Sequence, residues 1–444
     1  MEEKSISAAF VAFSYPDYPS EIVDHLIKRS QEAAEAAGVT LACREKVIVY
    51  EDAKNAVASL KKSDWDFIIA VIVSWIEAPN AIAVLREFFD KPILLWGHTM
   101  FKEKDELLTM TPLPGAAVVK ETLEEMGAKF KFIWGMPDDE EVKREIESFA
   151  RAAHCVSRLA TSKVGLLGYA SMGMYTGTFD HVKLRAKIGP EIDHLGQYVL
   201  IKKMDEIKDE EAKSLAKDLK AQWEISERVS DKDIENAAKM YLALKSLARD
   251  FGWDALVVKC QYELSRYYKM VPCVPLSILA DELPCSCEGD VPLIITQLIM
   301  HYISGKTTSY GDVHDIKGKA VLLGACGFAP LSLLYGKPHI ERHTALYEGL
   351  LTTSPYKLGK VTLARLASDK DGYKMHIAVG TVELPEKFHE VGCPPYPAMK
   401  VILDGDARHF GQNLMSQHYA IVYGDISKEL LEVCKLLNIR PVVS

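Results

Sequence analysis

Three side chains in the second half of the sequence have the types that bind a divalent metal ion and move protons: Glu288, Asp312 and His418. Two carboxylates and one imidazole suit a hard-to-borderline ion such as Mn²⁺. Three protein ligands leave coordination positions open, and an ion with open positions can act on a substrate. Glu288 and Asp312 flank a long apolar segment, and His418 lies far downstream. Spacing alone therefore does not mark the three residues as partners.

Each of these residues also has a purely structural interpretation. Glu288 can cap the helix that follows it and favour the helix dipole, although Asp290 is better placed as the cap. Asp312 follows a glycine, and a Gly-Asp pair between a helix and a strand is often a turn. His418 precedes an apolar strand-like run, where a histidine is often a hydrogen-bonded structural residue. From position alone, both interpretations stay open for all three.

The apolar segment Val291–Ser304 shows how Glu288 and Asp312 can meet. It predicts a helix that is apolar on nearly every face, and such helices lie inside a protein. A helix of this length spans about 21 Å. The residues after it are numerous enough to lead the chain back towards the helix start.

Two stretches resemble the L-fucose isomerase family. In that family a glutamate in an acidic Glu-x-Asp turn precedes a buried helix, and a metal-binding aspartate follows the glutamate after the interval that separates Glu288 from Asp312. The matching stretch runs from Cys287 to Asp312. The family's His-x-Ala-Ile/Val-x-Tyr-Gly motif is similar to His418–Gly424, and its Ile-x-Pro-Val-like strand is similar to Ile439–Val442. The order of the expected domains also matches, so the resemblance covers the whole chain.

The resemblance implies that Glu288, Asp312 and His418 hold Mn²⁺, with Mg²⁺ or Co²⁺ as substitutes. It implies an aldose–ketose isomerase that acts on an open-chain sugar through an enediol. Glu288 and Asp312 would also be the acid/base pair, and His418 would be a ligand only. The turn at Ser171 and Met172 resembles a turn that contacts the substrate in the family. The resemblance to the family also implies that the protein assembles as a hexamer.

The sequence departs from the family in ways that concern the sugar. The chain is shorter than the best-known L-fucose isomerases, and its glutamate turn reads Cys-Glu-Gly-Asp instead of a Glu-Asn-Asp type. A sugar like L-fucose or D-arabinose, or a modified hexose with an anionic group at C6, is therefore expected. The alternatives are a non-catalytic cytoplasmic sugar-binding protein and a metal-dependent hydrolase.

The elements that must position these residues alternate between strand-like and helix-like runs. Short apolar runs within such an alternation predict strands buried on both faces of a parallel sheet; examples are Ser7–Ser14, Asp66–Trp75, Lys163–Tyr169 and Ala255–Cys260. Ser20 is expected to cap the first helix. After Thr307, strand-like runs alternate with Gly, Pro and Asp turns, which predicts antiparallel or barrel-like structure.

We therefore predict an α/β protein with two doubly wound, Rossmann-like domains and a β-rich, barrel-like C-terminal domain. The predicted domains are residues 1–160, residues 161–305 with Glu288, and residues 306–444 with Asp312 and His418. Polar residues that follow strands in such sheets face ligands. Lys259 and Gln261 are candidate substrate contacts on this ground.

His98 also follows a predicted strand and is a weaker candidate for substrate contact. His314 is a further weak candidate. For both, the alternative is a hydrogen-bonded loop residue.

The composition sets outer limits on function. The chain has 444 residues, 48% of them apolar and 26% charged, and a net charge of −9. This balance argues against a binder of nucleic acid or anionic membranes. The start of the sequence lacks the pattern of a signal peptide, and no apolar stretch is long enough to span a bilayer. Nine scattered cysteines fit reduced thiols in the cytoplasm, and the close pair Cys285 and Cys287 lacks the spacing of a zinc finger.

Overall fold

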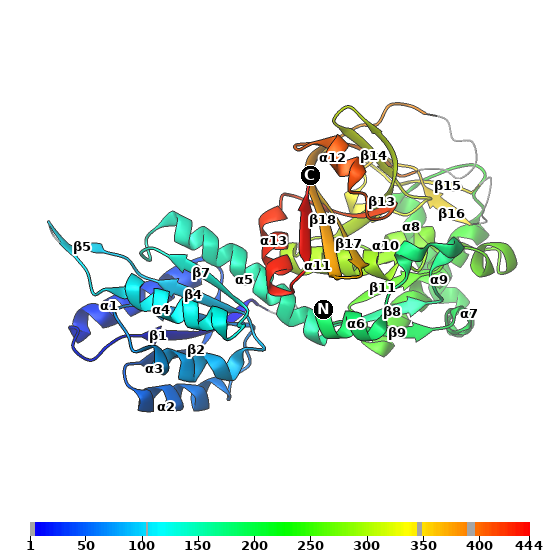
Figure 1. Cartoon of the computed structure of the whole chain (residues 1–444). Coiled ribbons are helices and arrows are strands. Elements are labelled where there is room, and N and C mark those ends of the chain that lie inside the picture. Colours follow the sequence, from blue (N-terminus) through cyan, green and yellow to red (C-terminus); the bar gives the residue numbers. More distant parts are fainter. Residues whose placement is uncertain (1–4, 104, 344–348, 389–395) are drawn as a thin grey trace. The chain divides into compact units, whose positions relative to one another are not determined.

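The computed structural model describes residues 5–103, 105–343, 349–388 and 396–444. The chain forms two compact units, residues 1–158 and 159–444 (Figure 1). Each unit has its own buried apolar cluster. None of the described cysteines forms a disulfide bond. Over the described ranges, no helix is both long enough and apolar enough to cross a membrane.

The first unit is built on a parallel sheet with the strand order β2-β1-β3-β4-β7. Its strands are β1 Ser7–Phe13, β2 Thr40–Val47, β3 Phe67–Ile72, β4 Ile93–Gly97 and β7 Phe130–Trp134. The order reverses direction at β1, and right-handed crossovers then put helices on both faces. Every residue of β3 and β4 is buried, as this arrangement requires.

The helices that connect these strands are α1 Ser20–Ala36, α2 Tyr50–Leu60, α3 Ala78–Leu85, η1 Arg86–Phe88 and α4 Pro112–Glu125, and α5 Glu140–Thr161 follows the last strand. A small hairpin, β5 Phe101–Glu103 and β6 Glu106–Leu108, follows β4. The prediction that Ser20 caps α1 is wrong. Pro19 holds the cap position, since its carbonyl accepts the first helical hydrogen bond from Val23, and Ser20 is already helical.

The second unit begins with another parallel sheet, in the order β12-β11-β8-β9. Its strands are β8 Lys163–Leu167, β9 Glu191–Leu195, β11 Ala255–Val258 and β12 Cys285–Cys287. The associated helices are η2 Ser171–Gly173, η3 Tyr175–Gly177, α6 His181–Lys187, α7 Gln197–Glu206, α8 Asp209–Gln222, α9 Asp231–Phe251, η4 Glu263–Tyr267 and α10 Cys273–Leu279.

The rest of the second unit contains a closed antiparallel barrel, in the order β17-β20-β13-β14-β19-β18, which a pairing of β17 with β18 closes. Its strands are β13 Thr308–Lys317, β14 Ala320–Gly324, β17 Gly359–Asp369, β18 Gly372–Glu383, β19 Ala398–Leu403 and β20 His418–Tyr423. The strand β21 Arg440–Val443 joins β18 in parallel. The predicted α/β fold with a C-terminal barrel is confirmed.

Smaller elements complete this unit: β10 Glu224–Ile225, β15 His339–Arg342, β16 Leu350–Thr352, η5 Leu331–Leu333, α12 Ala407–Gln412 and α13 Ser427–Leu436. The first two strands and β16 form a small separate sheet. The division of this unit into domains of residues 161–305 and 306–444 stays a prediction.

Helix α11, Val291–Ser304, joins the parallel sheet to the barrel. It contacts β11 and β12 of the sheet and β13, β17 and β20 of the barrel (Figure 1). This position explains why the helix is apolar on nearly every face, because both sides are covered. The prediction of a buried helix over these residues is confirmed.

Candidate active site

Glu288 lies in a tight turn between β12 and α11. Its backbone φ is +69° and that of Gly289 is +67°, so consecutive residues are left-handed. Such a conformation costs roughly 1–3 kcal/mol for a residue with a side chain, and it persists where surrounding contacts enforce it. Here the carbonyl of Glu288 accepts a hydrogen bond from the backbone N–H of Ser171 at 2.8 Å. A Cβ on Gly289 would lie 2.1 Å from the carbonyl oxygen of Tyr169, so glycine is required.

Asp290 is the N-cap of α11, as its position in the sequence predicted. Its Oδ1 accepts a hydrogen bond from the backbone N–H of Leu293 at 3.0 Å. With Asp290 as the cap, Glu288 does not need to serve the helix. Its side chain extends towards the barrel instead.

Asp312 and His418 lie opposite each other on the neighbouring antiparallel strands β13 and β20. Directly opposed residues present their side chains on the same face of a sheet, with Cβ atoms about 5 Å apart. The face is the outer one of the barrel, because the next residue, Tyr419, belongs to the apolar cluster inside. Asp312 is therefore a strand residue, and the alternative of a turn is wrong.

The three predicted ligands converge on one point. His418 Nε2 lies 3.3 Å from Glu288 Oε2 and 3.3 Å from Asp312 Oδ1. The imidazole is fully buried, and its Nε2 has no hydrogen-bond partner among the described residues. A buried nitrogen without a partner, faced by two carboxylates, fits the donor set of a divalent ion. The side chain of Asp312 is 25% exposed, so the point is open on that side.

Burial and mutual charge control the protonation of this cluster. Burial raises the pKa of Glu288, and the nearby Cys287 and Asp312 add to the effect against the opposing charge of His418. Burial alone would lower the pKa of His418, but Asp312, Asp290 and Glu288 outweigh it and raise that pKa well above 6.5. A bound cation would reverse these preferences, because it favours ionised carboxylates and a neutral imidazole.

Asp290 and Arg365 support the cluster from behind. Asp290 Oδ2 lies 2.8 Å from His418 Nδ1 and accepts a 2.8 Å hydrogen bond from Arg365 Nη1. Arg365 is fully buried, and its Nη2 donates to the carbonyl of Thr176 at 2.7 Å. Burial alone would raise the pKa of Asp290, but Arg365 and His418 outweigh it and lower it to about 2. The ionised carboxylate therefore holds Nδ1 and directs Nε2 towards Glu288 and Asp312.

Sequence reasoning did not predict the role of Asp290 towards His418, or that of Arg365. Asp290 was identified only as a cap. Arg365 stands in an otherwise apolar stretch of β17, LARLA. A charged residue within such a buried run was the signal that could have found it, since buried charges are paired.

The four predicted substrate contacts take different positions. Gln261 donates from Nε2 to Glu288 Oε1 at 3.3 Å, so it supports the metal-ligand candidate directly. The hydroxyl of Ser171 is buried without a hydrogen-bond partner among the described residues. Met172 is half exposed in the same loop, with φ +51°. Lys259 is fully buried, and its Nζ lies 2.6 Å from Glu263 Oε2.

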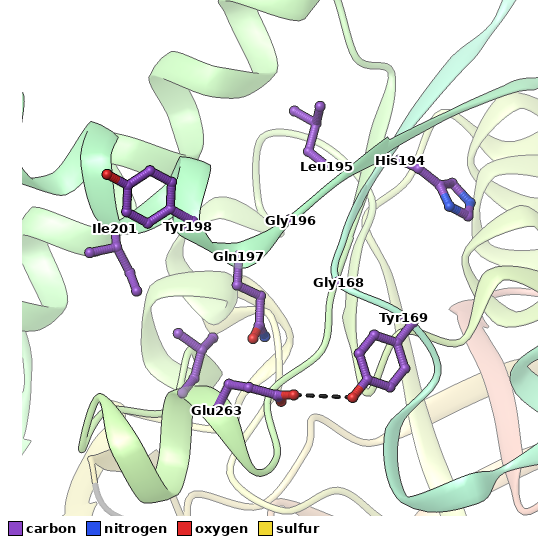
Figure 2. A pocket seen from close by; sticks show the side chains of 10 residues that line it. Gly168, Tyr169, His194, Leu195, Gly196, Gln197, Tyr198, Ile201 and Glu263 are labelled. Carbon is purple, nitrogen blue, oxygen red and sulfur yellow. Dashed lines mark hydrogen bonds between the residues drawn. The ribbon is translucent and has the colours of Figure 1, made fainter.

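A cavity of about 500 Å³ opens at the carboxyl ends of β8 and β9 (Figure 2). Tyr169 lines it and donates a hydrogen bond from its hydroxyl to Glu263 Oε1 at 3.1 Å. The buried Nζ of Lys259 lies 3.5 Å from the centroid of the Tyr169 ring. The backbone of Tyr169 also packs against Gly289, so the cavity adjoins the Glu288 turn.

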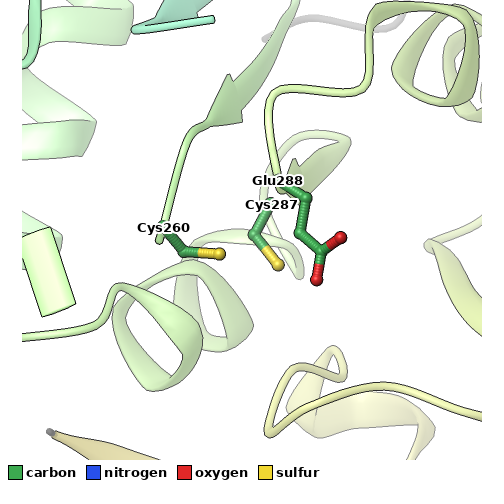
Figure 3. Close-up of side chains that lie close together, drawn as sticks. All are labelled: Cys260, Cys287 and Glu288. Carbon is green, nitrogen blue, oxygen red and sulfur yellow. The ribbon is translucent and has the colours of Figure 1, made fainter. Parts of the chain in front are cut away.

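Thiols lie on the other side of Glu288. One of its carboxylate oxygens and the Sγ atoms of Cys260 and Cys287 all lie within 4.8 Å of one another (Figure 3). Cys326 Sγ lies 3.7 Å from Glu288 Oε1. The carboxylate of Glu288 therefore lies near two groups of candidate metal ligands. One consists of the oxygen and nitrogen atoms of Asp312 and His418, and the other consists of the cysteine sulfurs.

Comparison with known proteins identifies curated relatives along most of the chain. The chain is 21% identical to a sulfoquinovose isomerase of Priestia aryabhattai over an alignment of 454 positions, gaps included, which covers 99% of both proteins. It is 22% identical to a sulfoquinovose isomerase of Alkalicoccus urumqiensis, over 79% of this chain and 80% of that protein. An L-arabinose isomerase of Bacillus subtilis (strain 168) is 25% identical over 45% of this chain and 42% of its own length. No family model matches the sequence.

Similarity of this extent to several proteins of one name shows that the chain is an enzyme, an aldose–ketose isomerase. The alternatives of a non-catalytic binding protein and of a hydrolase find no support among these relatives.

Proposed function

We propose that this protein isomerises a sulfonated aldose to the corresponding ketose. We propose that the reaction uses a divalent metal ion, preferably Mn²⁺, which Glu288, Asp312 and His418 bind. The observation that carries the proposal is the convergence of the two carboxylates on the buried Nε2 of His418, which has no hydrogen-bond partner among the described residues. We also propose that the chain is a shorter, divergent member of the L-fucose isomerase family, because these residues stand in that family's motifs.

Two residues orient the proposed ligands in the absence of the ion. Asp290 holds His418 Nδ1, and Gln261 engages Glu288 Oε1, which leaves Nε2 and Oε2 facing each other. A divalent ion there would polarise adjacent oxygens of an open-chain sugar and acidify the proton on C2.

The carboxylates then move protons between C2 and C1 through an enediol. Glu288, whose carboxylate is buried beside the proposed ion, is the candidate for the group that takes the proton. Asp312, which is more exposed, is the partner that returns or relays the proton at the opposite side of the carbon chain. His418 acts only as a ligand.

The sulfonate is proposed because relatives named sulfoquinovose isomerase match this chain over up to 99% of its length. This choice agrees with one of the two kinds of sugar that the sequence left open, a hexose with an anionic group at C6; the other was a sugar like L-fucose or D-arabinose.

The test is incubation of Mn²⁺-loaded protein with sulfoquinovose, L-fucose, D-arabinose and D-glucose, with ketose formation followed by NMR. We expect turnover of the sulfonated sugar and much slower turnover of its unsulfonated counterpart. Preferential turnover of L-fucose or D-arabinose would contradict the proposed substrate and leave the isomerase mechanism in place.

Replacement of Glu288 tests the mechanism. The Glu288→Gln protein keeps the shape of the side chain and loses its charge, so we expect turnover to fall by about 10²-fold to 10⁴-fold, as is usual for a lost acid/base group. Glu282→Gln is the matched control, because Glu282 is a surface residue paired with Lys245. Near-normal activity of Glu288→Gln would refute the assignment.

Hexameric assembly and a cytoplasmic location remain predictions, to be measured by sedimentation and by cell fractionation.

A further inference from the structure

Glu288 lies within reach of donor atoms that its proposed catalytic role does not use. The Sγ atoms of Cys260 and Cys287 and a carboxylate oxygen of Glu288 are mutually within 4.8 Å (Figure 3). Both cysteines are buried and neither forms a disulfide bond, and Cys287 Sγ lies 2.7 Å from the hydroxyl oxygen of Tyr310. The thiol of Cys326 also lies close to this group, 3.7 Å from Glu288 Oε1.

The parallel sheet brings these side chains together. Cys287 is the last residue of β12, and Cys260 follows the end of the neighbouring strand β11. Val258 pairs with Cys287 in register, so both cysteines stand at the carboxyl edge where such sheets bind ligands. Their proximity is a product of strand register, which the spacing of the cysteines in the sequence does not reveal.

We propose that Cys260, Cys287 and Glu288 form a second metal site, which takes a thiolate-binding divalent ion such as Zn²⁺. A tetrahedral zinc with Zn–S bonds of about 2.3 Å needs sulfurs about 3.8 Å apart, so only small side-chain shifts are required. Each thiol releases its proton to solvent as its sulfur binds the ion. Thiolates select such ions over Mn²⁺, which prefers oxygen and nitrogen ligands.

The two sites share Glu288, and this makes them competitors. An ion bound to the thiolates draws the Glu288 carboxylate away from His418 and Asp312. Zn²⁺ is therefore expected to inhibit the enzyme by removing a ligand from the first site as well as by simple exchange. This consequence for activity rests on the proposed function, whereas the existence of the thiolate site does not.

A spectroscopic titration tests the site without any assay of turnover. Chelator-treated protein is titrated with Co²⁺, whose bonds to thiolates give intense charge-transfer absorption in the near ultraviolet. We expect this absorption in the wild-type protein, and its loss in Cys260→Ser and Cys287→Ser. Cys285→Ser is the matched control, because Cys285 is an equally buried thiol on β12 outside the group. Co²⁺ binding without charge-transfer absorption in the wild-type protein would overturn the proposal, whatever the variants do.

Release of Mn²⁺, followed by EPR, tests whether the sites compete. Zn²⁺ added to the Mn²⁺-loaded wild-type protein should release the Mn²⁺, and the Cys260→Ala protein should need at least about tenfold more Zn²⁺. Equal release from both proteins would show direct exchange at the first site and overturn the competition. If no sugar is isomerised but the charge-transfer absorption follows the cysteines, the thiolate site stands and the proposed function fails.

Discussion

At the scale of the residue, one carboxylate serves three partners at once. Asp290 caps α11 with Oδ1, and with Oδ2 it holds both His418 and Arg365. The positive charges around it lower its pKa to about 2 against the effect of burial, so it is ionised throughout the physiological range. The orientation of the candidate ligand His418 therefore depends on a residue that does not face the proposed metal ion.

Replacing Asp290 with Asn separates its role as a helix cap from its charge pairing with Arg365 and His418. The amide oxygen of the Asp290→Asn protein can still cap the helix, but Arg365 and His418 lose their counter-charge. We expect a loss of about 3–5 kcal/mol in the free energy of unfolding, as for other buried ion pairs with one partner removed. We also expect the affinity for Mn²⁺ to fall about 10-fold to 100-fold.

Urea denaturation and an EPR titration with Mn²⁺ measure these two effects. Asp180→Asn is the control, because Asp180 caps α6 in the same way on the surface. An Asp290→Asn protein as stable as this control would contradict the role given to the buried charge.

The sequence predicts a residue's role when that role depends on neighbouring residues in the chain. It does not predict a role that depends on contacts with distant strands. The cap function of Asp290 depends on the helix that begins next to it, and the sequence predicted it correctly. Its contacts with Arg365 and His418 depend on strands far along the chain, and no local pattern specifies them. The candidate ligands themselves were found through family motifs, because spacing left each of them open.

At the scale of the element, the site depends on a turn and on a strand register. The left-handed residues Glu288 and Gly289 turn the chain from β12 into α11, and the pairing of β13 with β20 brings Asp312 opposite His418. The sequence predicted α11 because an apolar pattern on all sides is strong. It could not assign Asp312 to a strand, because Gly311-Asp312 resembles a turn and only tertiary pairing decides otherwise.

A methyl group at Gly289 tests the turn. We expect Gly289→Ala to lower both stability and Mn²⁺ affinity, because the new Cβ would collide with the carbonyl of Tyr169 and displace Glu288. Gly252→Ala is the control, since Gly252 has φ +68° but no atom within 4 Å of the new Cβ. The control should lose only about 1 kcal/mol from the left-handed backbone. Thermal unfolding that shifts equally in both variants would show that strain alone, and not the collision, matters at Gly289.

At the scale of the whole molecule, the two compact units have separate apolar cores, and the first unit contains a buried histidine. In the first unit, His98 lies buried beside Trp96, and its Nε2 is 2.9 Å from the hydroxyl of Ser30. This is the hydrogen-bonded alternative that the sequence left open for His98. Burial, with a smaller effect of Arg29, lowers its pKa from 6.5 to about 3.

The sign of the resulting pH dependence is definite. The unfolded chain binds a proton at His98 more readily than the folded chain, so stability from this residue is complete above pH 6.5 and is lost as the pH falls towards 3. At pH 4 the loss is about 3 kcal/mol. We expect His98→Gln to lose that much less stability than the wild-type protein between pH 7 and pH 4, measured by urea denaturation followed by tryptophan fluorescence.

The exposed His25 of α1 provides the matched control for this measurement. His25→Gln should respond to acid as the wild-type protein does. If His98→Gln loses as much stability on acidification as His25→Gln, then His98 does not govern the acid response of the first unit.

The origin of the site in distant parts of the chain also sets the order in which it can mature during synthesis. Glu288 and Asp312 leave the ribosome well before His418, which belongs to β20, the last barrel strand to be made. Until then, the nascent chain carries the carboxylates without the imidazole, and Asp290 lacks one of its two positive partners. Capture of the proposed metal ion by these three residues must therefore wait until β20 has been made and the barrel has closed.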